Sequence, residues 1–134
     1  MMRKVVFDTN VLVSALWSPG GKPSQIITQI ANGFIVPCYD YQIMLEYQDV
    51  LSRPKLNFSK GKTDAVLSDI KDRGIYAIAP KSSIVLPDET DRKFYDVAKA
   101  SEAILITGNI RHYPKEPFIM TPAEFLELND NTPV

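Results

Sequence analysis

The 134-residue sequence predicts an α/β fold, a three-layer α/β/α sandwich with a central parallel sheet of about four to five strands. Short apolar runs alternate with longer segments of helical periodicity along the chain. Strands that alternate with helices form parallel sheets, because each connection crosses one face of the sheet. Hydrophobic residues make up 45% of the sequence and charged residues 23%, as in an ordinary globular domain. One domain over residues 1–134 is therefore expected.

The first half of the sequence predicts two strands and three helices. The strands are short apolar runs, and proline or glycine residues mark where the helices begin and end. Ser18-Pro19-Gly20-Gly21 stops the first helix, and Gly33 ends the second. The predicted elements are a strand at Arg3–Phe7, a helix at Thr9–Trp17, a helix opened by Pro23-Ser24, a strand at Phe34–Cys38 and a helix from Asp40 or Tyr41 to about Ser52.

The second half predicts two or three strands and three helices. Gly74 ends an amphipathic helix, and Pro122 suits the first turn of a helix because that position needs no amide donor. The predicted elements are a helix at Lys62–Arg73, a strand at Ile75–Ala79, a helix at Asp88–Ser101, a strand at Ala103–Ile106, a fifth strand at Phe118–Met120 and a last helix from Thr121-Pro122.

Charge and composition exclude several classes of protein. No apolar run approaches the ~20 residues of a membrane span. The apolar run near the N-terminus is interrupted by Asp8, which argues against a signal peptide. The single cysteine, Cys38, cannot form an internal disulfide, so a cytoplasmic location is expected. With a net charge of −1, the chain could bind a nucleic acid only through a local basic patch.

Asp8 follows the first predicted strand directly. Asp and Asn favour the cap position of a helix, so Asp8 could simply cap the helix that begins at Thr9. It could also be a functional group, because sites in parallel sheets lie beyond the carboxyl ends of the strands. Thr107-Gly108-Asn109 follows another predicted strand and is expected at the same edge.

Glu46 lies within the helix YQIMLEYQDVL. On a helical wheel it stands at the edge of the apolar arc, whereas Asp49 lies further round toward solvent. A solvated helix acid is the simple interpretation of both. The edge position makes Glu46 the better candidate for a side chain that points into a cleft.

Asp91 lies in the sequence LPDETDRKFYDVAKA. Acids favour the first turn of a helix, which would explain Asp91 without any function. The wheel also puts Asp91 on the apolar face that carries Ala98, whereas Asp96 is expected to point away. Asp88 and Glu89 are expected to cap the helix. An acid in line with buried residues needs a partner, so Asp91 is a third functional candidate.

Together, Asp8, Glu46 and Asp91 are three carboxylates that the predicted fold can bring to one rim of the sheet. Carboxylates at close range repel one another, and a hard cation removes that repulsion. Oxygen ligands without a Cys or His cluster favour Mg²⁺ or Mn²⁺ over zinc. Such ions commonly serve phosphoryl chemistry.

The ordered set of motifs resembles the PIN-domain nucleases. It comprises Asp8-Thr9-Asn10 after a strand, Glu46 in a mid-chain helix, Asp91 opening a later helix, and ITGN. The stretches MLEYQDVLSRPKL and DETDRKFYDVAKASEAILITGN resemble the bacterial branch described as toxin components of toxin–antitoxin pairs.

The resemblance implies a PIN-like α/β/α fold and a ribonuclease site that depends on Mg²⁺ or Mn²⁺. Asp8, Glu46 and Asp91 would be the catalytic metal ligands, and Asn10, Thr107 and Asn109 the supporting polar groups. It further implies an RNA substrate, a cognate antitoxin protein as partner and a homo-oligomer, in most cases a dimer.

The sequence departs from the family pattern after the last core strand. Many members have a fourth Asp there, whereas this chain has Asn109, and His112 stands where another acid often appears. The departure weakens a second metal site. It keeps open an alternative function, in which a degenerate PIN fold binds RNA or a protein without cutting.

Two groups of basic residues are candidate RNA contacts, although each could be ordinary solvated surface. The group near the proposed site consists of Arg92, Lys93, Arg111, His112 and Lys115. The other group surrounds one loop and consists of Arg53, Lys55, Lys60 and Lys62.

Overall fold

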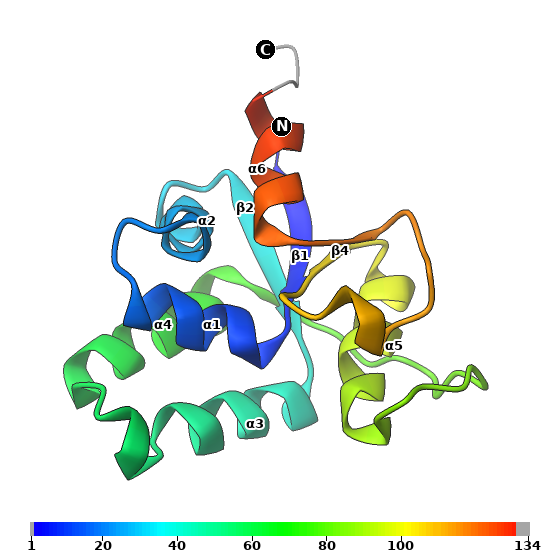
Figure 1. The fold of residues 1–134 in the computed structure, drawn as a ribbon, viewed down its shortest axis with the longest axis horizontal. Helices are drawn as coiled ribbons and strands as arrows, with labels where there is room; N and C mark the ends of the chain where they lie inside the picture. Colours follow the sequence, from blue (N-terminus) through cyan, green and yellow to red (C-terminus); the bar gives the residue numbers. More distant parts are fainter. Residues whose placement is uncertain (1, 131–134) are drawn as a thin grey trace.

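A computed structural model describes residues 2–130, and its centre is a parallel sheet of five strands (Figure 1). The strand order is β3-β2-β1-β4-β5, and every neighbouring pair is parallel. The predicted parallel sheet, including its fifth strand, is thereby confirmed. The strands are β1 (Arg3–Phe7), β2 (Ile35–Tyr39), β3 (Ile75–Tyr76), β4 (Ile104–Ile106) and β5 (Ile119–Met120).

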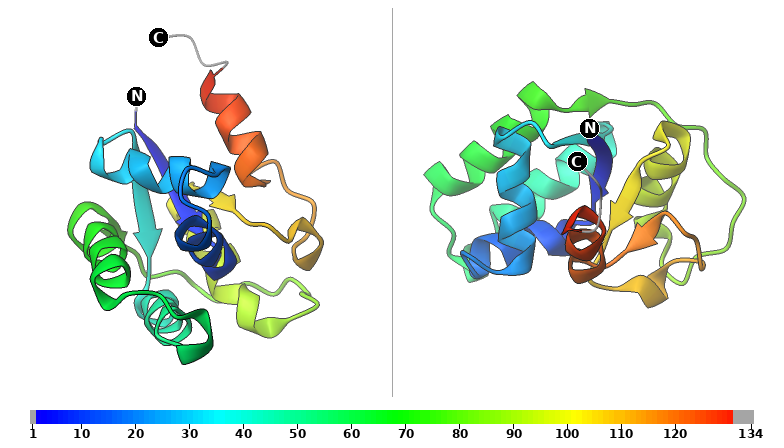
Figure 2. Two further views of the ribbon diagram at one scale, coloured as in Figure 1. Left: turned by 60° about the vertical axis from the view of Figure 1, so that its left-hand side comes forward. Right: turned by 90° about the horizontal axis from the view of Figure 1, so that it is seen from above.

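Six α-helices surround the sheet in this part of the chain. Figures 1 and 2 show α5 on one side of the sheet, and α1, α2 and α4 on the other, which confirms the predicted three layers. The helices are α1 (Thr9–Trp17), α2 (Lys22–Ala31), α3 (Tyr41–Leu51), α4 (Lys60–Arg73), α5 (Arg92–Ser101) and α6 (Pro122–Asp130). None of these helices is long and apolar enough to cross a membrane.

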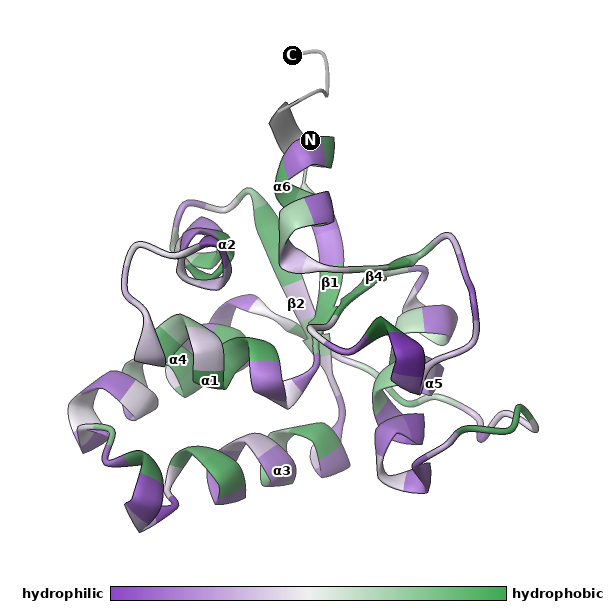
Figure 3. Cartoon of the chain, viewed as in Figure 1, coloured by the Kyte–Doolittle hydropathy of each residue, from purple (hydrophilic) through white to green (hydrophobic). Residues whose placement is uncertain are grey.

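The core lies on both faces of β1. Val5, Val6 and Phe7 are buried in this central strand, and Ile26 of α2 and Phe94 of α5 are buried in the two helical layers. Figure 3 shows polar residues at the start of β1 and apolar residues after them, whereas α3, α4 and α5 alternate apolar and polar residues. The part of β1 that is covered on both faces is apolar without alternation, because each of its side chains meets a helical layer.

Side-chain caps and one glycine determine where two long helices begin and end. Asp40 accepts a hydrogen bond from the Ile43 amide at the start of α3 (2.8 Å). Ser59 accepts from the Lys62 amide, so α4 begins at Lys60, two residues before the predicted start. At the other end of α4, a Cβ on Gly74 would lie 2.2 Å from the Ile70 carbonyl oxygen, so the chain can pass there only as glycine.

Two predicted elements are wrong in extent. The predicted strand Ile75–Ala79 contains only the two residues of β3, because its partner β2 ends at Tyr39, where the chain turns into α3. The predicted helix Asp88–Ser101 begins as a 3-10 turn, Glu89–Asp91, and becomes α-helical only from Arg92. Asp88 favours this tight turn, since its carboxylate accepts from both the amide and the hydroxyl of Thr90.

The strand order creates a crevice at the carboxyl edge of the sheet. From β1 the chain moves outward to β2 and β3, then returns to the other side of β1 to form β4 and β5. The connections that leave β1 and β4 therefore diverge, and such switch points are where parallel sheets bind ligands. Asp8 follows β1 and Thr107 follows β4, so both lie at this switch point.

Candidate active site

Asp8 occupies the cap position of α1, but its carboxylate is used elsewhere. Asp8 is only 6% exposed. Within the described residues of α1, its side chain accepts no hydrogen bond of capping geometry. Thr107 Oγ1 and Tyr113 Oη both donate to Asp8 Oδ2, each at 2.9 Å. The Asp8 side chain therefore does more than cap a helix, because two residues distant in sequence hold its carboxylate.

Tyr113 links the electrostatics of three acids. Burial raises its pKa well above the usual range, and the charges of Asp8, Asp91 and Glu46 raise it further. Tyr113 therefore stays a protonated donor, and its hydroxyl lies within the electric field of all three carboxylates. Burial also raises the pKa of Asp8. Hydrogen bonds from Thr107, Tyr113 and the Asn10 backbone oppose that rise, and the charge of Glu46 adds to it.

Glu46 points from α3 toward the N-terminal ends of α1 and α5. Thr9 Oγ1 donates a hydrogen bond to Glu46 Oε2, and Lys93 Nζ lies 2.8 Å from Glu46 Oε1. The neighbouring Tyr47 fixes this part of α3 to β1, because its buried hydroxyl donates to the Phe7 carbonyl oxygen at 2.5 Å. In contrast, Asp49 faces solvent, as expected.

Asp91 lies where the 3-10 turn meets α5, and its side chain is 14% exposed. Burial, together with the charges of Asp8 and Asp88, raises the pKa of Asp91 to about 6, although His112 opposes the rise. His112 Nδ1 lies 3.3 Å from Asp91 Oδ2, yet this buried oxygen has no hydrogen-bond partner within residues 2–130. Asp91 thus keeps an unsatisfied acceptor.

The predicted supporting residues differ in what they contribute. The fully buried Thr107 donates to Asp8 and accepts from the Asn109 amide (3.0 Å). Asn10 Oδ1 accepts from the Gly108 amide at 3.3 Å, which ties α1 to the loop after β4. Asn109 itself is exposed, and it donates to Thr107 through its backbone amide.

The predicted basic residues are also unequal. Arg92 is almost buried and donates to Glu89, Ser82 and Ile84, so it fastens residues 82–84 to α5. Lys93 pairs with Glu46, whereas Arg111 and Lys115 are exposed. In the other basic group, Arg53 pairs with Asp49 and Lys60 with Asp64.

One expectation for α5 is wrong. Asp96 was predicted to point away from the buried face, but it is only 8% exposed. The segment before α5 lies over this side of the helix, and the Ser82 amide donates to Asp96 Oδ2 at 3.2 Å. The position of that segment depends on long-range packing, which a helical wheel does not contain.

Residue patterns also missed Tyr113. No periodicity marks it, and it reaches Asp8 only because the chain turns at Ile110–His112. The sequence offers one weak indication. Tyr113 is a large aromatic residue that follows Thr107 and Asn109 closely, in the loop already expected at the edge of the sheet that carries the site.

The donor chemistry of the site fits a hard cation. Among residues 2–130, no three His, Cys, Asp or Glu side chains form a group ready to hold a metal ion. Glu46 is instead held by Thr9 and Lys93. The acids nevertheless offer oxygen donors only, the charge of Glu46 raises the pKa of Asp8, and the charge of Asp8 raises that of Asp91. Asp91 Oδ2, beside His112, is buried without a hydrogen bond in the described residues. A cation would relieve both the repulsion and the unsatisfied oxygen.

Comparison with known proteins adds one positive finding. A search of curated proteins gave no match. A family model described as PIN domain matches residues 4–111, most of the chain, and the match includes Asp8, Glu46 and Asp91. Together with the parallel sheet and the acids at its switch point, this match shows that the chain belongs to the PIN domain family, whose members are generally nucleases.

Proposed function

We propose that the protein is a metal-dependent endoribonuclease that hydrolyses RNA phosphodiesters with water as the nucleophile. The observation that carries this proposal is the buried Asp8 carboxylate at the switch point of the sheet, held by Tyr113, whose pKa the charges of Asp8, Asp91 and Glu46 all raise. Like charges in one place lower the stability of the fold, and acids with raised pKa values occur preferentially at functional sites.

Asp8, Glu46 and Asp91 would hold Mg²⁺ or Mn²⁺, which would make a water more acidic and stabilise negative charge on the phosphoryl oxygens. Thr107 and Tyr113 orient the Asp8 carboxylate through two hydrogen bonds to one oxygen. That leaves its other oxygen for a ligand.

Lys93 provides positive charge beside Glu46, and the His112 ring lies beside Asp91, where a phosphate would approach. Attack by water agrees with the position of Cys38, the only cysteine, because a thiol buried in the sheet cannot reach a substrate. Arg111, exposed beside His112, would add a contact to the RNA backbone.

We also propose that the protein is the toxin component of a toxin–antitoxin pair and acts in the cytoplasm, with a cognate antitoxin as partner and a dimer as its assembly. The support is the resemblance of its two central sequence stretches to that branch of the family.

An alternative is a PIN domain that binds RNA or a protein without cutting it. Two observations favour it: Asn109 stands where many members carry an acid, and Lys93 already neutralises Glu46. The test is incubation of purified protein with structured and single-stranded RNAs in Mg²⁺, in Mn²⁺ and in EDTA, beside an Asp8→Asn variant.

The proposed ribonuclease cleaves only with metal, and the variant loses that cleavage. Equal cleavage in EDTA would contradict the proposal. Metal binding without cleavage of any RNA would favour the binding module.

A further inference from the structure

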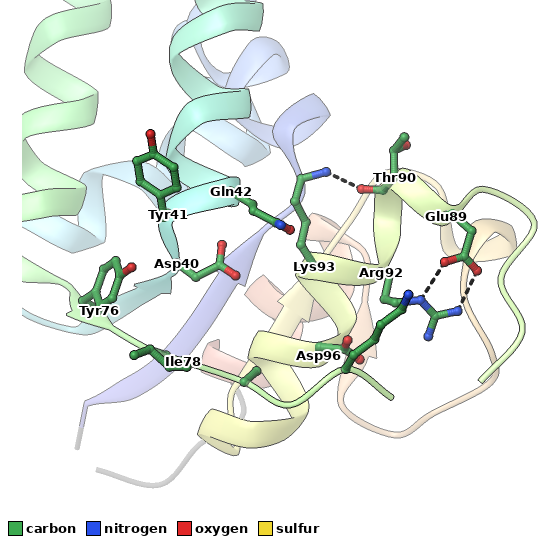
Figure 4. Close-up of a pocket in the computed structure, with 13 residues that line it drawn as sticks. Asp40, Tyr41, Gln42, Tyr76, Ile78, Glu89, Thr90, Arg92, Lys93 and Asp96 are labelled. Carbon is green, nitrogen blue, oxygen red and sulfur yellow. Dashed lines mark hydrogen bonds and ion pairs between the residues drawn. The ribbon is translucent and has the colours of Figure 1, made fainter. Parts of the chain in front are cut away.

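A pocket of about 590 Å³ opens beside the proposed cleavage site (Figure 4). Its walls are the start of α3, the chain that follows β3 and the first turns of α5. Lys93 belongs to both places, because it lines the pocket and its Nζ lies 2.8 Å from Glu46 Oε1. A molecule in the pocket would therefore lie next to the carboxylates, and the volume suits a nucleotide-sized group.

Two exposed aromatic rings form one wall of this pocket. Tyr41, the first residue of α3, is 64% exposed, and Tyr76 of β3 is 55% exposed. The ring of Tyr76 packs edge-on against Tyr39, with centroids 5.7 Å apart, which limits its motion. Large aromatic side chains that are exposed together in a hollow commonly mark a binding site. Flat rings of this kind are suited to stacking on planar ligands.

Polar groups line the space between the aromatic wall and α5. Figure 4 shows the Asp40 carboxylate and the Gln42 amide directed into the space between the tyrosines and α5. Only one oxygen of Asp40 is engaged in capping α3. On the α5 wall, Asp96 Oδ1 finds no hydrogen-bond partner in the described part of the chain. Acceptors and amides of this kind pair with the edges of nucleobases.

We propose that this pocket binds the base of an unpaired nucleotide that flanks the phosphodiester at the carboxylate site. The base would stack on Tyr41 and Tyr76, its edge would face Asp40 and Gln42, and the exposed Lys81 would contact the adjoining backbone. The inference rests on the proposed nuclease function, because the pocket is assigned to the same RNA strand. A base within a duplex is already paired and stacked, so the pocket selects single-stranded RNA.

Binding of labelled RNA tests this proposal without depending on cleavage. The probes are a short single-stranded RNA of mixed sequence and its perfect duplex, and the protein is the full chain carrying Asp8→Asn, so that the probe stays intact. The single strand binds more tightly than the duplex. Adding Tyr41→Ala weakens single-strand binding by roughly 5- to 100-fold, the usual effect of losing one base–aromatic stack. Tyr41→Trp, which keeps a ring, restores most of the binding.

The matched control is Phe34→Ala. Phe34 is also an exposed aromatic residue (61%), but it precedes β2 at the opposite edge of the sheet. This variant binds RNA as its parent does, and melting curves show that each variant is folded. Equal binding of single strand and duplex, or an unchanged affinity in Tyr41→Ala, overturns the proposal.

The cleavage assay separates this inference from the proposed function. If cleavage depends on metal but neither cleavage nor binding changes in Tyr41→Ala, the base-binding pocket is refuted and the nuclease function is retained. If single-stranded RNA binds in a way that depends on Tyr41 but no RNA is cleaved, the base-binding pocket is supported and the nuclease function is refuted.

Discussion

Lys93 puts a positive charge beside Glu46, where it would compete with a metal ion for that carboxylate. Lys93→Met keeps the aliphatic stem and removes the ammonium group. In EDTA we expect this variant to lose about 1–3 kcal/mol of stability, because a partly buried Glu46 keeps its bond from Thr9 but loses its ion pair. With Mn²⁺ we expect a larger rise in melting temperature than in the unmodified protein, since the ion no longer displaces an ammonium.

Melting curves across a Mn²⁺ titration measure both effects. The control is Lys99→Met on the same helix, whose ammonium lies over the Tyr95 ring, 5.7 Å from its centroid, and away from Glu46. A Mn²⁺ response that is the same for Lys93→Met and Lys99→Met would contradict the competition.

Asp91 makes the metal-free protein sensitive to pH. Its pKa of about 6 in the folded state lies above its unfolded value of 3.8, so folding disfavours the charged form. The folded state therefore pays no penalty below pH 4 and loses stability as pH rises through 6. The loss is at most ~3 kcal/mol, since one pKa unit corresponds to ~1.4 kcal/mol.

Unfolding curves in EDTA between pH 4 and 8 follow this loss. The fall in stability shrinks in Asp91→Asn, whereas Asp49→Asn, an exposed acid on α3, keeps it. Asp8 still contributes in Asp91→Asn, because burial raises its pKa in the same direction. A fall of the same size in Asp91→Asn would show that another group causes it.

At the scale of single residues, the sequence could indicate acids but not their partners. Asp8, Glu46 and Asp91 stand out because strand ends and helical faces follow from local periodicity. The bond from Tyr113 to Asp8 joins residues 105 positions apart, and the Lys93–Glu46 pair joins two helices. Such contacts depend on how the elements pack, and one sequence does not contain that information.

Two glycines of the α4 region provide a matched test at the scale of elements. A Cβ on Gly74 would lie 2.2 Å from the Ile70 carbonyl oxygen and 2.5 Å from that of Pro37, so α4 and β2 would have to separate. Gly61, within α4, has open space around it. We expect Gly74→Ala to lose at least ~2 kcal/mol of stability, and Gly61→Ala to gain up to ~1 kcal/mol.

Urea unfolding of the two variants beside the unmodified protein measures the difference. Equal stabilities for Gly74→Ala and Gly61→Ala would mean that the close approach of α4 to β2 is not present in solution.

The extents of the elements were predictable where local sequence determines them. Arg3–Phe7 and Thr9–Trp17 agree with β1 and α1, because an apolar run and a glycine-rich stop define them. β3 is shorter than predicted, because the end of its partner strand limits it rather than its own sequence. The 3-10 turn before α5 was likewise not predicted from the sequence. The hydrogen bonds between Asp88 and Thr90 favour it over a regular α-helix.

At the scale of the whole molecule, the parallel sheet and its strand order connect sequence to function. The alternation of strands and helices predicted the layers, and the order β3-β2-β1-β4-β5 brings Asp8 and Thr107 to one crevice. The acids Glu46 and Asp91 come from α3 and from the turn that leads into α5, two elements distant in sequence. Stability at this edge and the proposed catalysis therefore depend on the same carboxylates.

The most direct test of this account is a pair of melting curves for the unmodified protein and Asp8→Asn, in EDTA and in Mn²⁺, beside an RNA cleavage assay. In EDTA the variant should be equally or more stable, because it removes one charge from a repelling cluster. In Mn²⁺ the unmodified protein should gain more stability, and the variant should lose cleavage. The same Mn²⁺ shift and the same cleavage in both proteins would contradict a metal-binding role for Asp8.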